Sequence, residues 1–186
     1  MKFVCYTSIE QLPKSAEALF VQAEKDSMFF SRPWLQNIID NAPDDTESLL
    51  LACVIEGDSI LAILPLVKNL NNSLNSLKHR YSSLYTLLIA EDDQQLILNC
   101  LAHGLDTLQC DGLLLEPVDE NDHNINGLQN SMEACGFNCH RSFRFYNWFH
   151  RVHGQSYENY MSDRPSRLRN TIARKARKLA REQGFV

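Results

Sequence analysis

The sequence predicts an α/β domain with a mixed sheet, antiparallel at one end and parallel at the other, followed by a basic helix. Two observations carry this prediction. Extended and helical patterns follow one another in the order strand, helix, helix, hairpin, strand, helix, strand, helix, strand. A central hairpin makes its strands antiparallel, whereas strand–helix–strand alternation is typical of parallel neighbours. Residues 163–186 also hold eight Lys or Arg against two Asp or Glu, whereas residues 1–162 hold ten against twenty-one.

The N-terminal part is predicted to form one strand and two helices. Residues 3–6 alternate as a short strand does. Residues 11–25 are predicted to form a helix with an apolar face of Leu12, Ala16, Leu19, Phe20 and Ala23. The second helix is expected to begin after Ser31, which can cap it, with Pro33 in its first turn and its end near Asp40.

A β-hairpin is the strongest local prediction. Residues 49–55 and 60–67 are apolar, β-rich runs joined by Glu-Gly-Asp-Ser, a sequence typical of a hairpin turn. Pro65 near the end of the second run predicts a sheet edge or a bulge there, because proline donates no backbone hydrogen bond. The Asn- and Ser-rich residues 69–76 have no periodicity and are predicted as a loop.

Strands and helices are predicted to alternate after this loop. Residues 81–90 are expected to form a strand and residues 93–105 a helix. Residues 112–116 are predicted as a buried strand that Pro117 stops.

The last part of the α/β domain is predicted to be a loop, a helix and a strand. Residues 120–127 are polar and read as a loop, and residues 128–135 as a helix that Gly136 ends. Residues 137–149 are predicted to form a long aromatic strand that contains Phe143, Phe145, Tyr146, Trp148 and Phe149.

The C-terminal residues predict one basic amphipathic helix. Ser162 or Asp163 can cap it, Pro165 suits its first turn, and Gly184 suits its end. One narrow apolar stripe is formed by Leu168, Ile172, Ala176 and Leu179. The other faces carry Arg167, Arg169, Arg174, Lys175, Arg177, Lys178 and Arg181. Residues 185–186 read as the start of a strand, so the sequence is expected to be part of a longer one.

Length and composition narrow the class of protein. With 186 residues, 44% hydrophobic and 22% charged, the chain can bury one sizeable core and is not of a disordered type. No apolar run is long enough for a membrane span, and the N-terminus lacks the apolar segment of a signal peptide, so a cytoplasmic location is expected. The six cysteines show no CxxC spacing. We therefore expect reduced thiols and no metal site.

Several motifs, in this order, resemble the CelD-like bacterial acetyltransferases of the GNAT superfamily, which are linked to cellulose and exopolysaccharide biosynthesis. They are Phe-Ser-Arg-Pro-Trp-Leu at residues 30–35, the hairpin at 49–66 ending Ala-Ile-Leu-Pro-Leu, Leu-Leu-Leu-Glu-Pro at 113–117, and a spaced pattern that runs from Tyr160 through Arg164-Pro-Ser and Arg169 to Arg174-Lys. The element order is also that of the GNAT fold. The resemblance spans essentially the whole chain.

This resemblance implies a division of the chain. Residues 1–153 are expected to form a degenerate N-terminal GNAT-like domain. Residues 154–186 are expected to form the basic helix that leads to a second GNAT half, absent from this sequence. That missing half, a small amine acceptor and acetyl-CoA or another acyl-CoA are the partners and cofactor implied at family level.

The same resemblance suggests that this half does not bind CoA itself. The superfamily holds the CoA pyrophosphate on an Arg/Gln-x-x-Gly-x-Gly/Ala loop before a helix, where backbone amides bind phosphate. Residues 88–94 stand at that position, contain no glycine, and include Glu91, Asp92 and Asp93. Three carboxylates repel a pyrophosphate. The chain alone is therefore expected to bind no cofactor and to be inactive.

The candidate site residues are of three kinds. Glu116 follows a predicted strand and is a candidate general base that deprotonates an amine; the alternative is an exposed carboxylate at a strand end. Tyr81, Tyr85, Tyr157 and Tyr160 are candidates for an acceptor pocket; the alternative is half-buried packing. Candidate anion-binding residues, which otherwise form a solvated basic face, are Arg164, Ser166, Arg169, Arg174 and Lys175.

Two functions of different classes follow. In the first, the chain is the scaffold and acceptor-side part of an N-acyltransferase. In the second, it is a non-catalytic module whose basic helix contacts an anionic partner such as nucleic acid or a membrane surface. The acidic body and the few aromatic residues near that helix argue against nucleic acid, and its thin apolar stripe argues against a membrane. No GxSxG, P-loop or HExxH motif is present.

Overall fold

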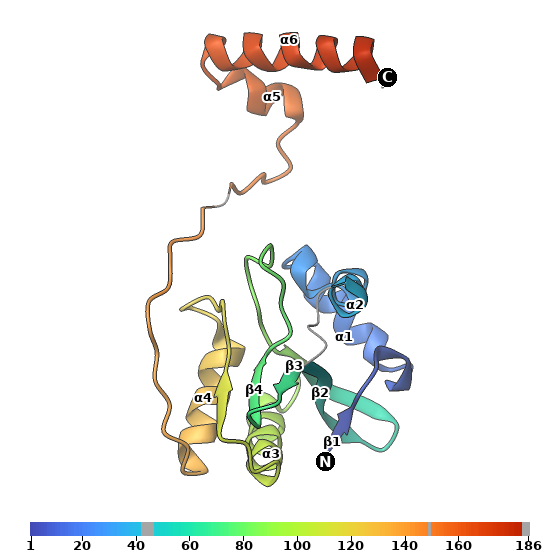
Figure 1. Cartoon of the computed structure of the whole chain (residues 1–186), viewed down its shortest axis with the longest axis vertical. Helices are drawn as coiled ribbons and strands as arrows, with labels where there is room; N and C mark the ends of the chain where they lie inside the picture. Colours follow the sequence, from blue (N-terminus) through green and yellow to red (C-terminus); the bar gives the residue numbers. More distant parts are fainter. Residues whose placement is uncertain (42–46, 149, 184–186) are drawn as a thin grey trace. The chain divides into compact units, whose positions relative to one another are not determined.

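The computed structural model describes residues 1–41, 47–148 and 150–183 and divides into two compact units. We call Met1–Phe145 the body and Tyr146–Val186 the C-terminal unit. The body is an α/β fold built on one mixed sheet (Figure 1). The predicted fold class is therefore confirmed.

The sheet has the strand order β1-β2-β3-β4-β6, and β5 pairs with β3 beside β4. All these pairs are antiparallel except β4 with β6, which is parallel. The predicted change of direction across the sheet is thus present. The strands are β1 Lys2–Tyr6, β2 Glu47–Glu56, β3 Ser59–Asn69, β4 Ser73–Ser76, β5 Leu88–Ile89 and β6 Gly112–Leu114.

The β2–β3 hairpin forms as predicted, and Gly57 adopts the positive φ of +56° that its tight turn needs. Pro65 lies opposite Leu51 in a regular part of the ladder, and the register shift falls at Val54/Ile55 instead. On the other side of β3, β4 and β5 pair on either side of Pro65. The missing N–H of Pro65 therefore sits where the neighbouring strand is interrupted, rather than at a bulge.

Helices cover both faces of the sheet. The helices α1 (Ala16–Glu24) and α2 (Arg32–Asn41) pack on one face, against Leu51, Cys53 and Ile63. The helices α3 (Gln94–Thr107) and α4 (His123–Ala134) pack on the other face, against Ala52, Val54 and Leu64. Because neighbouring strand residues point to opposite faces, the continuous apolar runs of β2 and β3 supply both cores.

The first helix begins later than predicted. Residues 11–25 were expected to be helical, but the short 3-10 helix η1 (Ile9–Gln11) comes first and α1 begins at Ala16. The Ser15 hydroxyl donates to Asp58 O (2.9 Å) and accepts from the Ile60 N–H (3.0 Å), which ties this end of α1 to the hairpin turn. The predicted Ser31 cap of α2 is confirmed, since its Oγ accepts the Trp34 N–H at 3.3 Å.

Residues 69–89 differ from the prediction in two ways. The polar stretch predicted as a loop contains β4, whose pairing with both β3 and β6 compensates for its low β-propensity. The strand predicted at 81–90 is reduced to β5, because residues 77–87 leave the sheet between β4 and β5. Hydrogen bonds between residues that are far apart in the sequence stabilise this excursion. Local residue patterns do not predict such bonds.

The predictions for β6 and α4 also need correction. The strand β6 is half-exposed rather than buried, with Leu114 51% exposed, because it lies at the end of the strand order. The helix α4 begins five residues before the predicted Leu128. The Asp122 carboxylate accepts the N–H groups of Asn124 (2.9 Å) and Ile125 (3.1 Å) and caps it there. Gly136, with φ +94°, follows the end of α4 as predicted.

The long aromatic strand predicted for residues 137–149 is absent from the described residues 137–148; Phe149 lies outside them. Phe137 and Cys139 pack against the α3–α4 core. Beyond them the side chains are exposed, Phe145 by 53% and Trp148 by 92%. Aromatic residues favour strands, but a strand also needs a hydrogen-bonded neighbour.

The C-terminal unit holds two helices rather than the one predicted. Helix α5 (Tyr157–Ser162) ends at the residues expected to cap the basic helix, and α6 (Ser166–Gln183) begins directly after Pro165. Proline disfavours helical backbone in the residue before it, so the break between α5 and α6 falls at Arg164. Gly184, Phe185 and Val186 lie outside the described residues. Among the described helices, none is long and apolar enough to cross a membrane.

Candidate functional site: a pocket beside an interrupted strand

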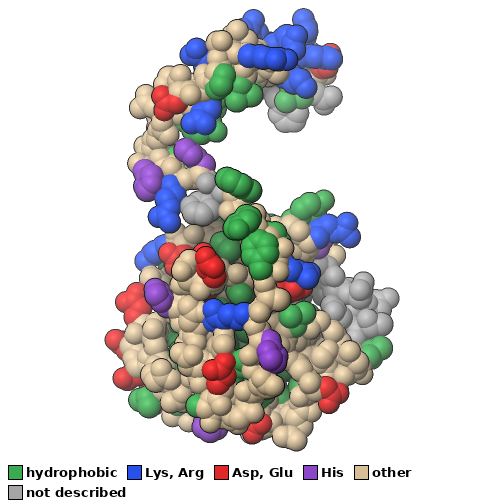
Figure 2. Space-filling view, turned by 90° about the vertical axis from the view of Figure 1, so that its left-hand side faces the viewer, with side chains coloured by type: hydrophobic (Ala, Val, Ile, Leu, Met, Phe, Trp, Pro, Cys, Tyr) green, Lys and Arg blue, Asp and Glu red, His purple; other side chains and the backbone are tan. Residues whose placement is uncertain are grey.

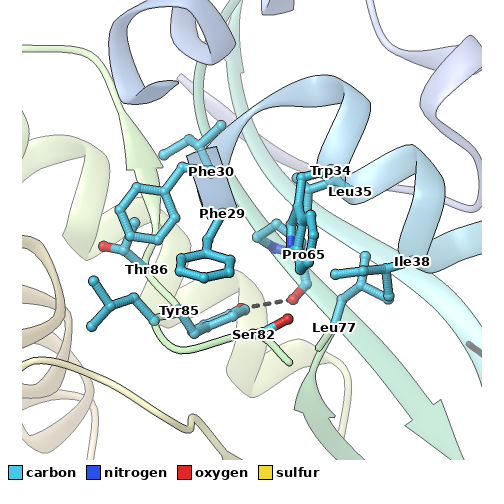
Figure 3. A pocket seen from close by; sticks show the side chains of 12 residues that line it. Phe29, Phe30, Trp34, Leu35, Ile38, Pro65, Leu77, Ser82, Tyr85 and Thr86 are labelled. Carbon is cyan, nitrogen blue, oxygen red and sulfur yellow. Dashed lines mark hydrogen bonds between the residues drawn. The ribbon is translucent and has the colours of Figure 1, made fainter. Parts of the chain in front are cut away.

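A small pocket opens where β4 and β5 separate (Figure 3). Its walls come from α2, the 3-10 helix η2 (Met28–Phe30), β3 and residues 77–88. Its enclosed part has room for about one water molecule. The lining side chains are Phe29, Phe30, Trp34, Leu35, Ile38, Pro65, Leu77, Ser82, Leu84, Tyr85, Thr86 and Leu88.

Tyr85 holds the excursion of residues 77–87 in place. Its hydroxyl donates to Pro65 O at 2.7 Å, the dashed line in Figure 3, and its N–H donates to Pro117 O at 2.7 Å. Burial raises the pKa of Tyr85 well above its ordinary value, so the phenol stays neutral. Tyr85 therefore lines this pocket, and its hydroxyl proton is already donated to Pro65; its role in binding an acceptor stays a prediction.

Three other polar groups belong to pocket residues. Trp34 Nε1 is buried, and no hydrogen-bond acceptor among the described residues reaches it. Ser82 Oγ accepts the His79 N–H at 3.1 Å, and Thr86 Oγ1 donates to Asp122 Oδ2 at 2.5 Å. A buried indole N–H without an acceptor is costly, so the pocket suits an atom that accepts one hydrogen bond. Sequence patterns did not single out any of these residues.

Glu116 lies in a cluster of charges just past β6. Its carboxylate is bonded to Lys78 Nζ and lies 3.3 Å from Arg144 Nε, and its side chain is 19% exposed. The hydrogen bond from Lys78 lowers the pKa of Glu116 against the opposing effect of burial, and the charges of Lys78 and Arg144 lower it further. A carboxylate with a lowered pKa is a weaker base. The role of Glu116 as general base stays a prediction.

The N-terminus of α3 is surrounded by carboxylates. Glu91, Asp92 and Asp93 are exposed and directly precede the helix. Glu91 Oε1 accepts a hydrogen bond from Gln22 Nε2 at 3.1 Å, and Asp93 stands at the N-cap with φ +51°. The positive end of the helix dipole is therefore already faced by negative charge, which disfavours a bound phosphate.

The other predicted site residues are spread over both units. Tyr81 is 71% exposed, outside the pocket lining, with its ring 5.1 Å from that of His79. Tyr157 and Tyr160 lie on α5. The structure brings Tyr160 and Arg164 together: the guanidinium lies 4.5 Å from the ring centroid, and Arg164 Nε donates to Tyr160 O at 3.3 Å.

The remaining anion-binding candidates belong to α6. Ser166 is its first residue, and Arg169, Arg174 and Lys175 are exposed along it. Figure 2 shows Lys and Arg side chains crowded on this helix. Anion binding by these residues stays a prediction.

No protein-family model matches this sequence, and none of the curated proteins matches it. Three solved structures are similar to the chain at low identity. They are a probable acetyltransferase (18% identity, TM-score 0.48, covering 81% of this chain and 99% of its own), an aminoglycoside acetyltransferase from an uncultured soil metagenomic sample (12%, 0.46, 80% and 96%), and a transcriptional regulator from Bacillus halodurans C-125 (12%, 0.44, 78% and 99%).

Proposed function

We propose that this chain is the scaffold and acceptor-side part of a GNAT-type N-acyltransferase. Such an enzyme moves an acyl group from acyl-CoA to an amine. The proposal is supported by the resemblance of the ordered sequence motifs and by the order of elements around the mixed sheet. The observation that supports a partial rather than a complete enzyme is the acidic N-terminus of α3.

The acidic residues before α3 argue against binding of acyl-CoA by the body. An acyl-CoA pyrophosphate needs free amides at a helix N-terminus, and Glu91, Asp92 and Asp93 present negative charge there instead. Acyl-CoA would thus have to be bound by another part of the complete enzyme. The body would then contribute shape and acceptor contacts.

The pocket at Trp34 is the part of the body best suited to an acceptor. Because its enclosed part has room for about one water molecule, the indole N–H would donate to a bridging water or to one oxygen of an acceptor that rests against the pocket. In the reaction, the amine nitrogen forms a bond to the thioester carbonyl carbon, the C–S bond breaks, and the amine proton leaves to a base or water. Positioning the two reactants supplies most of the rate in such a transfer.

A thiol-release assay tests the proposal. Acetyl-CoA is incubated with the chain and with methylamine, tyramine or spermidine, and free CoA thiol is measured. We expect no release above background from the chain as it stands. Sustained turnover with any of these amines would contradict the proposed acceptor-side role.

The alternative function has one observation in its favour: Arg169, Arg174 and Lys175 on α6 are all exposed. A module of this type would bind a labelled single-stranded oligonucleotide with an affinity that falls steeply with salt. A variant with these three residues changed to Gln would lose that binding. Absence of salt-dependent binding by the unchanged chain would remove this alternative.

A further inference from the structure

A thiol and an imidazole meet where the C-terminal end of α4 lies against α3. Cys135 stands at the C-cap of α4, and His103 lies within α3. The distance from Cys135 Sγ to His103 Nδ1 is 3.5 Å, although the two residues are 32 positions apart in the sequence. The packing of the two helices around Leu101 and Leu128 holds them in this arrangement. The fold thus places a nucleophile within hydrogen-bonding reach of a base.

Both side chains of this pair are accessible to water. His103 is exposed, so its ring can exchange protons with the solvent. Cys135 is partly exposed and packs on its other side against the α3–α4 core. The packing limits the movement of the sulfur, and the exposed side leaves it open to a small reagent. Modified thiols in proteins combine such access with a nearby positive charge.

The other five cysteines lack this arrangement. In the part of the chain that the structure describes, none of them lies within hydrogen-bonding distance of an imidazole. Cys53 is buried, and burial raises its pKa to about 12. Cys139, in the aromatic segment that follows α4 (residues 137–148), is partly exposed like Cys135. Burial and the charge of Glu133 raise the pKa of Cys139, which makes it a suitable internal comparison.

The charges near Cys135 make any reaction there depend on His103. A thiol reacts as its thiolate, so negative charge develops on the sulfur. The negative end of the α4 dipole lies at Cys135, and Glu133 lies two residues before it; both oppose this charge. An imidazole that accepts the thiol proton places a positive charge beside the sulfur and offsets them.

We propose that Cys135 is a modification site that undergoes exchange with a low-molecular-weight disulfide, with His103 as its base. The imidazole takes the thiol proton, and the Cys135 thiolate attacks one sulfur of the disulfide. A new S–S bond to Cys135 forms while the old S–S bond breaks. The second sulfur leaves as a thiolate and takes the proton from the imidazolium. This exchange is independent of the proposed acyl transfer, because the pocket at Trp34 belongs to the other face of the sheet.

Timed peptide mass spectrometry of the reduced chain with hydroxyethyl disulfide tests this assignment. The reagent is uncharged, so the acidic body does not repel it. We expect Cys135 to form the mixed disulfide about three- to tenfold faster than Cys139. H103Q keeps a polar side chain but removes the base, and should slow Cys135 to the rate of Cys139 or below. H123Q, at the exposed first residue of α4, is the matched control and should leave both rates unchanged.

Three results would overturn the proposal. In the first, Cys139 of the unchanged chain reacts as fast as Cys135. In the second, Cys135 reacts at its original rate in H103Q, and in the third H103Q slows Cys135 and Cys139 by the same factor. Because His103 is exposed, H103Q should fold normally. Buried Cys53 checks this in the same samples, since it should stay unmodified in every variant.

Discussion

The β2–β3 hairpin and the segment 137–145 both lie where the sequence predicts strands, but they are stabilised in different ways. In the hairpin, each strand has a hydrogen-bonded neighbour, and Leu64 and Leu66 are completely buried. In the segment, Phe137 and Cys139 pack against the α3–α4 core, whereas the side chains beyond Cys139 are exposed. Arg141 and Arg144 bond to side chains of α4 and to Glu116. Extended backbone becomes stable sheet only when a second strand satisfies its hydrogen bonds and a helix layer covers its face.

The largest expected effect is the loss of stability when a side chain of the hairpin, rather than one of the segment, is shortened. Changing Leu64 to Ala should lower the free energy of unfolding by about 2–5 kcal/mol, because it leaves a cavity in a fully packed site. Changing Phe145 to Ala should alter it by less than about 0.5 kcal/mol. Urea unfolding measures both. Equal losses would show that the segment is packed as tightly as the hairpin.

Gly104 and Gly112 allow a second comparison of a packed position with an open one. A Cβ on Gly104 of α3 would lie 2.0 Å from Phe3 Cγ, so G104A should cost about 1–3 kcal/mol as the side chain of Phe3 is displaced. A Cβ on Gly112 of β6 meets nothing within 4 Å, so G112A is the matched control and should be neutral. Thermal unfolding distinguishes them. A destabilising G112A would mean that the β6 end is covered.

The cap of α4 should have a smaller effect. D122A removes the acceptor for the Asn124 and Ile125 N–H groups and for the Thr86 hydroxyl, and should cost about 1 kcal/mol. D111A, at an exposed position before β6, is its control and should cost less than about 0.5 kcal/mol. A loss from D122A no larger than that of its control would refute the capping role.

The Glu116 cluster predicts a pH dependence. The pKa of Glu116 is lowered in the folded state, so its stabilising effect is present above its ordinary pKa and is lost as pH falls through the folded pKa. At neutral pH, E116Q should be less stable than the unchanged chain by under about 1 kcal/mol, since the cluster is partly exposed. Urea unfolding from pH 7 downward should show this difference shrinking in acid. A difference that grows in acid would contradict the assignment.

The smallest expected effect is a difference in the rate at which two cysteines are alkylated. Burial raises the pKa of Cys53 in β2 to about 12. Burial, followed by the charge of Glu133, also raises the pKa of Cys139 in the aromatic segment, but Cys139 is only partly buried. In the folded chain, iodoacetamide should therefore modify Cys139 slowly and leave Cys53 intact, as peptide mass spectrometry can measure. Faster modification of Cys53 than of Cys139 would contradict the tighter packing of the hairpin.

Local patterns were sufficient for much of the fold. The hairpin turn at Gly57 and the Ser31 cap depend on residues close together in the sequence, and both formed as expected. The excursion of residues 77–87 depends instead on Tyr85 binding Pro65 and Pro117. Those contacts join distant parts of the chain, so no local pattern reports them.

The same distinction applies to the candidate site. Tyr85 was one of four tyrosines named as acceptor-pocket candidates, and the acidic residues before α3 were noticed because charge is visible in a sequence. Trp34 was not a candidate site residue, since an indole N–H without an acceptor becomes visible only when its surroundings are known. The strand at residues 137–149 was predicted from its aromatic residues, which favour extended backbone but supply no neighbouring strand.

The proposed role depends most on Glu91, Asp92 and Asp93, and calorimetric titration of acetyl-CoA tests it directly. The unchanged chain should show no saturable binding. The triple variant E91Q/D92N/D93N removes the repulsion at the N-terminus of α3 and should bind more strongly than the unchanged chain. Micromolar binding by the unchanged chain would contradict the account, because acyl-CoA would then be held despite three carboxylates at the expected phosphate position.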